Sequence, residues 1–464
     1  MTPQTQFDPV VSFRNTQGDA VRGTIVNLQR KSLVMEIYDP NSVMQVSEVL
    51  NDVSLRLGTR SAYAGKAVVI SMVNTGLTAL VSATLIDEWR ELSAESLVPG
   101  AVALETHAFV RSWDERSRIR PTYQLRVNEL RAYLADVARW VEQVDMSDAL
   151  PKEADGRLRE DFFHELAAPL IARAHSFMAE LEEEAACIEP ERDSAHRAFA
   201  QAALHPLLLR APFVFRTYSK PLGYAGDYEM VNQMLADPRQ GANTYFQIVN
   251  TAFWQAAAAN AHRNRIDILV AYLSRQADAA RASGRPFRVL NVGCGPAVEI
   301  QRFLQSYPEP QWLVFELVDF SEETLAYTRA KLEACAAVSG SAVSITYTHD
   351  SVNQLLKRRG AAALPVSGEF DAVYCAGLFD YLSDKVCTRL MQHFAARMRA
   401  GASMLVTNVH SCNPEKLFVM GHLLEWYLIY RDEAQLERLL PPARAQRVYV
   451  DATGVNVFAE LSLA

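Results

Sequence analysis

The stretch from residue 287 to residue 300 holds the pattern with the clearest chemical meaning. Its sequence, FRVLNVGCGPAVEI, predicts a strand, a glycine turn and the first turn of a helix. Gly293 and Gly295 let the backbone approach a ligand closely, and the helix that follows offers unpaired N–H groups at the positive end of its dipole. Val298 stands where the dinucleotide fingerprint has its third glycine, so the pattern disfavours an NAD enzyme.

Carboxylates follow the next two predicted strands. Asp319 comes directly after the strand 312–318, where it is placed to accept hydrogen bonds from ribose hydroxyls. Asp350 and Ser351 follow the strand 344–348, where an acidic side chain can bind an adenine amino group. A single aspartate after a strand is more often a turn or cap residue. The functional interpretation therefore depends on the whole ordered set of residues and not on one aspartate.

The elements that position these residues form an alternating series. Strands are expected at 287–292, 312–318 and 344–348, from 369 onward, and at 403–409, with helices between them. This alternation predicts a doubly wound parallel sheet that binds ligands at the carboxyl ends of its strands. We therefore expect an α/β, Rossmann-like domain over residues 276–464.

An α-helical region is expected at 100–275, as a substrate-binding or lid region. Apolar residues recur at helical spacing in 123–143 and 162–184, and a further helix is expected at about 244–275. Prolines at 206, 212 and 221 predict a loop-rich stretch before that last helix.

The first 95 residues predict a small β-barrel or open sandwich. Short runs of β-branched and apolar residues, separated by turn formers, predict strands at 24–27, 33–38, 67–74 and 78–86.

The composition is typical of a globular protein of several domains. The chain has 464 residues, 49% of them hydrophobic, and a formal net charge of −8, which argues against a protein that coats nucleic acid. The six cysteines form no C-x-x-C pair, which disfavours a zinc site or a disulfide framework. With neither a signal-peptide pattern nor a long apolar span, we expect a cytoplasmic protein without metal.

Together, the ordered motifs resemble those of class I S-adenosylmethionine-dependent methyltransferases. The resemblance covers about 285–464 and implies that the two glycines face the methionine part, that Asp319 binds the ribose, and that Ala376 and Gly377 form the floor beneath the sulfonium. An arginine of the helix entering this domain is expected to clamp the cofactor's carboxylate, unless that face of the helix is solvated. The expected cofactor-binding residues are Gly293, Cys294, Gly295, Glu299, Asp319, Phe320, Asp350, Ser351, Ala376, Gly377 and Arg263.

A second resemblance concerns segments outside these motifs. The sequence KPLGYAGDYEM at 220–230 is similar to a segment of a bacterial family annotated for synthesis of 3-hydroxypalmitic acid methyl ester, a quorum signal. Segments 408–414 and 425–431 resemble stretches of the same family. The resemblance implies O-methylation of a 3-hydroxy fatty acid, with methylation of another small molecule as the alternative.

Several residues are candidates for substrate binding or catalysis. A carboxylate is already deprotonated near pH 7, so methyl transfer to it mainly needs alignment and removal of water. His410 follows the strand 403–409 and is the catalytic candidate, as a base or as an orienting donor, unless it only bonds nearby backbone. The expected substrate-binding residues are Tyr224, Asp227, Tyr228, Trp426 and Tyr430. Their alternative role is to join the helical region to the catalytic core.

Other classes of function fit the sequence less well. Residues 376–379 lack the Pro-Pro loop of amino-methylating DNA enzymes, which disfavours nucleic acid as the substrate. Residues 1–95 resemble a PilZ-type barrel, a fold that often binds cyclic di-GMP, and this keeps open a signalling protein with a non-catalytic methyltransferase core. Arg14 and Arg22 have the wrong spacing for the nucleotide-binding arginine pair, so we expect a docking or structural barrel that joins a protein partner or a second copy.

Overall fold

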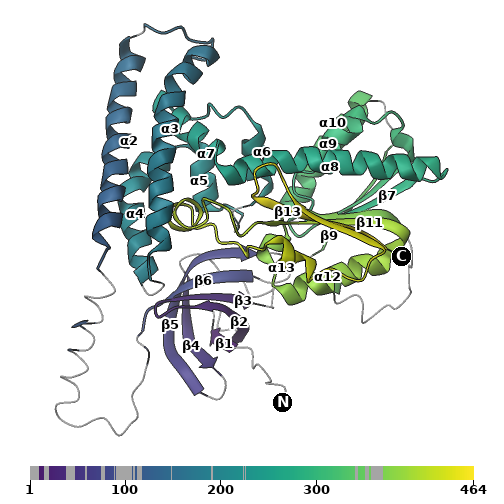
Figure 1. Cartoon of the computed structure of the whole chain (residues 1–464), viewed down its shortest axis with the longest axis horizontal. Helices are drawn as coiled ribbons and strands as arrows, with labels where there is room; N and C mark the ends of the chain where they lie inside the picture. Colours follow the sequence, from purple (N-terminus) through teal and green to yellow (C-terminus); the bar gives the residue numbers. More distant parts are fainter. Residues whose placement is uncertain are drawn as a thin grey trace.

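The structure is a computed structural model with three parts: a barrel, a helical region and an α/β domain (Figure 1). It describes residues 10–14, 20–37, 48–57, 60–74, 79–87, 89, 107, 110–111, 118–147, 149–189, 192–222, 224, 226–339, 343–350, 355–356 and 369–463.

The N-terminal strands close into an antiparallel barrel. Strands β1 (Val10–Arg14), β2 (Ala20–Leu28), β3 (Ser32–Ile37), β4 (Val49–Leu57), β5 (Arg60–Asn74) and β6 (Ala79–Leu85) follow the order β1-β2-β3-β6-β5-β4, and β1 pairs with both β2 and β4. The sequence patterns missed β1 and β4. In β4 the pairing register shifts between Leu50 and Val53, and Asp52 has a φ of 51°, so an irregularity breaks the alternation that would have marked the strand.

Among the described residues, seven helices make up the helical region and its link to the sheet. They are α2 (Pro121–Ser147), α3 (Glu160–Ala186), α4 (Asp193–Leu208), α5 (Pro212–Ser219), α6 (Tyr228–Leu235), α7 (Thr244–Trp254) and α8 (Ala257–Ala282). The loop-rich stretch expected after residue 206 is wrong in part, because Pro206 lies inside α4 and Pro212 starts α5, where its missing N–H costs no hydrogen bond. The single helix expected at 244–275 is two helices that meet at Gln255 and Ala256.

The α/β domain is a seven-stranded sheet in the order β12-β13-β11-β10-β7-β8-β9. Its strands are β7 (Phe287–Val292), β8 (Leu313–Asp319), β9 (Ser344–His349), β10 (Phe370–Cys375), β11 (Met398–Val409), β12 (Ala445–Val450) and β13 (Asn456–Ser462). The first five in chain order pair in parallel, whereas β13 runs antiparallel to both of its neighbours. This is a Rossmann-like α/β fold, as expected, and the sequence patterns missed only the last two strands.

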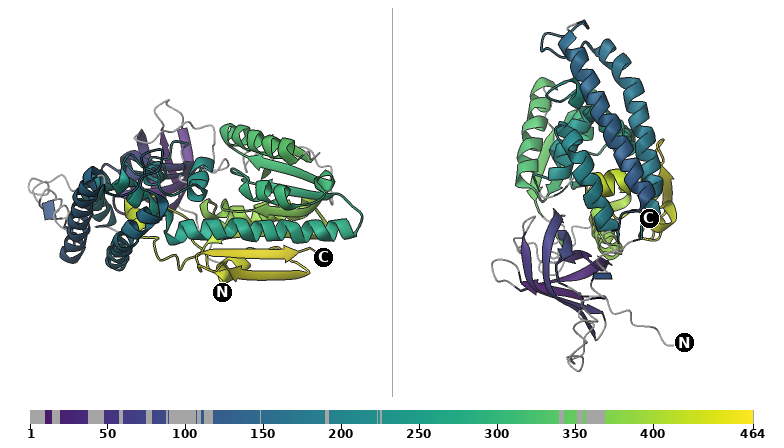
Figure 2. Two further views of the ribbon diagram at one scale, coloured as in Figure 1. Left: turned by 90° about the horizontal axis from the view of Figure 1, so that it is seen from above. Right: turned by 90° about the vertical axis from the view of Figure 1, so that its left-hand side faces the viewer.

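Helices cover both faces of the sheet (Figure 2). The helices of this domain are α9 (Val298–Ser306), α10 (Glu322–Ser339), α12 (Asp384–Arg397) and α13 (Glu433–Glu437). The long helix α8 also packs on the sheet, against β7, β10 and β13, while its first turns belong to the helical region. Helix α8 therefore ties the two parts together.

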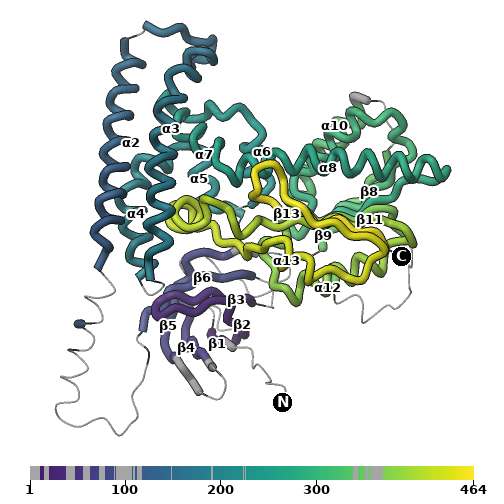
Figure 3. The backbone as a smooth tube through the Cα atoms, viewed as in Figure 1, coloured from purple at the N-terminus to yellow at the C-terminus, as the bar shows by residue number. Residues whose placement is uncertain are grey.

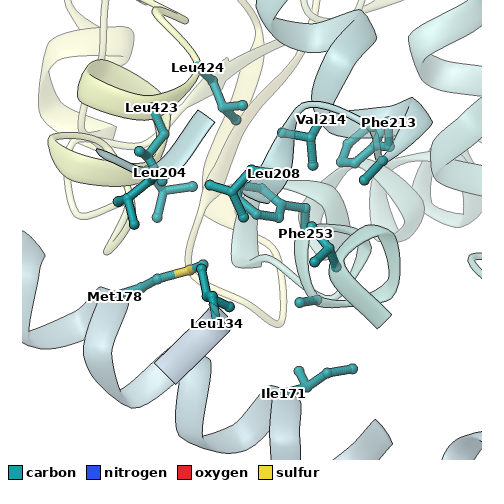
Figure 4. Close-up of a cluster of buried hydrophobic side chains, with 14 of the residues drawn as sticks. Leu134, Ile171, Met178, Leu204, Leu208, Phe213, Val214, Phe253, Leu423 and Leu424 are labelled. Atoms are coloured by element: carbon teal, nitrogen blue, oxygen red, sulfur yellow. The ribbon is translucent and has the colours of Figure 1, made fainter. Parts of the chain in front are cut away.

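The chain returns from the sheet to the helical region after β11. The tube in Figure 3 shows the yellow coil of η6 (Phe418–Leu423), a π-helix, beside α4. Leu423 and Leu424 join the buried core that includes Leu204, Leu208 and Phe253 (Figure 4). This return brings the segment that follows, with Trp426 and Leu428, to the edge of the sheet.

Candidate active site

A pocket opens at the carboxyl ends of the parallel strands. Its empty space amounts to about 1330 Å³, part of which is open solvent. Its walls come from the ends of β7, β8 and β10, from one face of α6 and α8, and from residues 420–428. The pocket therefore lies between the sheet and the helical region.

The glycine turn adopts the conformation that its residues predict. Gly293 and Gly295 have φ values of 72° and 51°, in the left-handed region that favours glycine. The N–H groups of Gly293 and Cys294 both donate to the carbonyl oxygen of Val318, at 2.8 and 3.2 Å. The turn is thereby fastened to β8, and it presents the start of α9 to the pocket.

The carboxylate of Asp319 is buried and held by backbone. Its Oδ2 accepts the N–H of Gly295 at 3.1 Å, and its Oδ1 accepts the N–H of Ser321 at 3.0 Å. Burial raises the pKa of Asp319, an effect that the two backbone donors oppose. A ligand that donates hydroxyl groups to this carboxylate would stabilise its charged form.

Two opposite charges lie deeper in the same pocket. The Oε1 of Glu299 accepts the hydroxyl of Tyr374 at 2.7 Å and the side-chain amide of Asn291 at 3.3 Å. Arg265 is fully enclosed, and its Nη1 has no hydrogen-bond partner among the described residues. An unpaired buried guanidinium is costly, so this atom is placed to receive an anionic ligand.

The structure does not bring Arg263 to the pocket. Its guanidinium lies 3.5 Å over the ring of Trp254 and donates to the carbonyl oxygens of Trp254 and Met234, at 2.9 and 3.3 Å. Arg265, two residues further along α8, lines the pocket instead. The alternative for this part of α8 was a solvated helix face. Arg265 does not lie on such a face, because it is only 8% exposed.

His262 also lines the pocket, one helical turn before Arg265. Its Nδ1 lies 3.3 Å from the carbonyl oxygen of Ala258, and its ring centroid lies 6.4 Å from that of Trp426. Burial, reinforced by the charges of Arg265 and Arg263, holds the pKa of His262 well below its usual range. The imidazole is therefore neutral at pH 7.

His410 is held by structural contacts and does not line the pocket. Its Nδ1 accepts the N–H of Cys412 at 3.0 Å, and its Nε2 donates to Oε2 of Glu433 at 2.8 Å. Both ring nitrogens are thus satisfied, one by the turn after β11 and the other by the first residue of α13. These contacts match the alternative of a histidine bonded to its surroundings.

Two of the five expected substrate-binding residues line the pocket, namely Tyr224 and Trp426. The indole N–H of Trp426 donates to the hydroxyl of Tyr381 at 3.0 Å, and the ring of Tyr224 packs on Phe320 at 5.2 Å between centroids. Leu80 of the barrel belongs to the same buried cluster as Tyr224 and Tyr381, so the barrel reaches the rim of the pocket.

The other three candidates lie outside the pocket lining. Asp227 caps α6 through the N–H of Met230 and pairs with Arg216 at 2.8 Å. The hydroxyl of Tyr228 donates to Glu323 at 2.9 Å. Tyr430 is enclosed beside the sulfur of Met420. The bond of Tyr228 fits the alternative in which these residues join the helical region to the α/β domain, whereas the bonds of Asp227 stay within the helical region.

Nine of the eleven expected cofactor-binding residues line this one pocket. Those that line it are Gly293, Cys294, Gly295, Glu299, Asp319, Phe320, Asp350, Ala376 and Gly377. Ser351 lies outside the described residues. Asp380 and Tyr381 also line the pocket, from the 3-10 helix η5 (Phe379–Tyr381) that comes after β10, and no sequence pattern marked them. Arg265 lines it in place of the expected Arg263.

The described part of the chain contains no group of three His, Cys, Asp or Glu side chains that could hold a metal ion. Across the same residues, no helix combines the length and the apolar character needed to cross a bilayer.

Comparisons with known proteins give only low similarities. No family model and no curated protein matches the chain. A "possible exported protein" from Bordetella parapertussis is 17% identical over 72% of this chain and 96% of its own, with a TM-score of 0.40. Magnesium protoporphyrin IX methyltransferase from Synechocystis with bound S-adenosylhomocysteine is 14% identical over 54% and 98%, with a TM-score of 0.36.

The N-methyltransferase NodS from Bradyrhizobium japonicum in complex with S-adenosylhomocysteine is 12% identical over 51% of this chain and 97% of its own, with a TM-score of 0.30. Sequence identity and TM-score are low in all three cases. The assignment of a function to this chain therefore rests on the geometry of its own site.

Proposed function

We propose that the chain is an S-adenosylmethionine-dependent O-methyltransferase. One observation carries the proposal: Asp319, Glu299 and Arg265 are three buried charged groups that line one pocket beside a glycine turn. S-adenosylmethionine brings a matching set of groups, namely ribose hydroxyls, an α-amino group and a carboxylate. Few other ligands would satisfy all three residues at once.

Each buried group has a role in holding the cofactor. Asp319, fixed by the N–H groups of Gly295 and Ser321, accepts the ribose hydroxyls. Glu299 accepts the α-amino group, and Arg265 donates its unpaired Nη1 to the carboxylate. Asp350, which also lines the pocket, lies after β9, where the sequence analysis expects the adenine. The residues present therefore fit the cofactor.

The bound cofactor would supply a methyl group on a sulfonium. The chain's own residues align the acceptor with it and exclude water from the reacting atoms. Alignment alone contributes about 7–11 kcal/mol to such reactions, and a carboxylate acceptor needs no base near pH 7. The contacts of His410 with Cys412 and Glu433 agree with a reaction that does not use this histidine.

The acceptor is a fatty acid, most simply a 3-hydroxy fatty acid esterified at its carboxylate. Helices α6 and α8 and residues 420–428 give the pocket an apolar wall, beside the polar side chains of His262 and Arg265. It is lined by Val231, Met234, Leu235, Ile266, Met420, Trp426 and Leu428. Burial of an alkyl chain against this wall contributes about 0.8 kcal/mol per methylene group.

The test is transfer of a deuterated methyl group to a series of saturated and 3-hydroxy fatty acids, with the methyl ester detected by mass spectrometry. The wild-type chain should form the ester, and Asp319→Ala should not. Binding of S-adenosylhomocysteine without ester formation from any acid would refute the acyl substrate. A folded wild-type chain that does not bind S-adenosylhomocysteine would refute the methyltransferase itself.

A further inference from the structure

His262 lines the pocket together with Arg265 and with residues of the apolar wall. Arg265 lies one helical turn further along α8, and the ring centroid of Trp426 lies 6.4 Å from that of His262. If Arg265 holds the cofactor, as proposed above, His262 faces the place where the acceptor enters. Its role therefore concerns the acceptor rather than the cofactor.

The hydrogen bond to Ala258 fixes the tautomer of this imidazole. A carbonyl oxygen only accepts, so the Nδ1 of His262, 3.3 Å from the carbonyl oxygen of Ala258, carries the proton. In the neutral ring, Nε2 then has a free lone pair. Within the described residues no group bonds to Nε2, so the pocket offers an acceptor atom without a protein donor.

The surrounding charges restrict what can donate to this atom. Arg265 and Arg263, both on α8, lower the pKa of His262 further, in the same direction as its burial. A carboxylate has no proton to donate, and an ammonium group would meet the positive charges of the two arginines. A neutral hydroxyl avoids both conflicts, because it donates a hydrogen bond and adds no charge.

We propose that His262 is a positioning residue that accepts a hydrogen bond from a hydroxyl group of the methyl acceptor. The inference rests on the proposed methyltransferase function and names the residue that selects the acceptor. A site built to bind a hydroxyl rejects the analogue that lacks it, because the buried polar atom is then left unpaired. His262 thus makes the enzyme prefer hydroxylated acyl acceptors over plain ones.

The test compares binding of 3-hydroxypalmitate and palmitate to the full chain saturated with S-adenosylhomocysteine, by calorimetry. The wild type should bind the hydroxy acid about 10–100-fold more tightly, which corresponds to a buried hydrogen bond to one polar atom. His262→Phe removes the acceptor atom and keeps a planar ring, so the ratio of the two affinities should fall to about one. His262→Gln offers an amide oxygen and should restore part of the preference.

The measurements distinguish a failure of this inference from a failure of the proposed methyltransferase function. S-adenosylhomocysteine affinity should stay the same in all three proteins, since His262 is assigned to the acceptor. A merely structural role would weaken both acids equally and leave their ratio unchanged. Equal binding of the two acids to the wild type, an unchanged ratio in His262→Phe, or no binding of either acid to the loaded protein would overturn the inference.

Discussion

The guanidinium of Arg265 lies directly against Gly377. A Cβ built on Gly377 would fall 3.0 Å from Nη1 and 3.3 Å from Nη2 of Arg265, and the φ of Gly377 is +96°. Helix α8 thus places its buried cation against the turn after β10, where a Cβ would make an unusually tight contact with the guanidinium. The contact joins the helical region to the cofactor half of the pocket.

Replacing this glycine should therefore impair the site more than the fold. Gly377→Ala should weaken binding of S-adenosylhomocysteine at least about tenfold, because the new methyl group displaces Arg265, and should cost about 1–2 kcal/mol in stability from the left-handed backbone. Gly454→Ala is the matched control, since Gly454 has a φ of +72° and open space around its Cβ. It should lose similar stability with unchanged affinity. Calorimetry and urea unfolding measure both, and equal affinities in the two variants would contradict the prediction.

Arg265→Gln should weaken binding of S-adenosylhomocysteine. Loss of a charged hydrogen bond to a ligand carboxylate costs about 1.5–3 kcal/mol, so the affinity for S-adenosylhomocysteine should fall about 10–100-fold. The ligand-free variant should also lose stability, because Arg265 offsets the buried carboxyls of Glu299 and Asp380, but it should still unfold cooperatively.

Arg263→Gln is the control for Arg265→Gln on the same helix. It removes the contact with the Trp254 ring and the two bonds to backbone carbonyls, so the protein should lose stability and keep its affinity. If the two variants show the opposite pattern, the assignment of Arg265 to the carboxylate is refuted.

This pair of arginines shows what the sequence could and could not reveal. Gly293, Gly295 and Asp319 could be predicted as site residues because each lies within a local strand-and-turn pattern. Such a pattern can be recognised in a single sequence. Choosing between Arg263 and Arg265 needs the rotation of α8 about its axis. The apolar spacing of Leu269 and Leu273 carries that signal, because i, i+4 and i+8 positions share one face and Arg265 belongs to this series.

Features that depend on distant segments were not predicted. Strand β13 lies between β11 and β12 only because the last forty or so residues fold back on the sheet, and its sequence alone does not specify antiparallel pairing. The return of η6 to the helical core likewise places Trp426 in the pocket through contacts with α3 and α4. No local pattern in residues 418–428 indicates those partners.

His410→Ala should act on stability alone. The variant loses the bonds to Cys412 and Glu433, which should lower the free energy of unfolding by about 1–2 kcal/mol. The rate of methyl transfer at saturating cofactor and acceptor should stay within about twofold of the wild-type rate. A fall of about 10² or more would restore His410 as a catalytic group.

Asp380 should make stability depend on pH. Burial raises the pKa of Asp380 to about 6, although Arg265, Arg431 and the N–H of Val409 oppose the shift. The folded state then binds a proton more tightly than the unfolded state, so this group's contribution to stability is complete below about pH 4 and is lost as the pH rises through about 6.

Asp380→Asn removes this titration and keeps an oxygen that can accept the N–H of Val409. Relative to the wild type, the variant should gain up to about 3 kcal/mol in unfolding free energy between about pH 4 and pH 7. Urea unfolding at several pH values measures the difference. A difference that stays constant over that range would contradict the pKa of Asp380.

Calorimetric titration of the full chain with S-adenosylhomocysteine tests the central claim most directly. The wild type should bind one molecule per chain, and Asp319→Ala should bind at least about 10-fold more weakly while its thermal unfolding remains cooperative. That result would establish the glycine turn and Asp319 as a cofactor site. The absence of binding by the folded wild type, or undiminished affinity in Asp319→Ala, would contradict the claim.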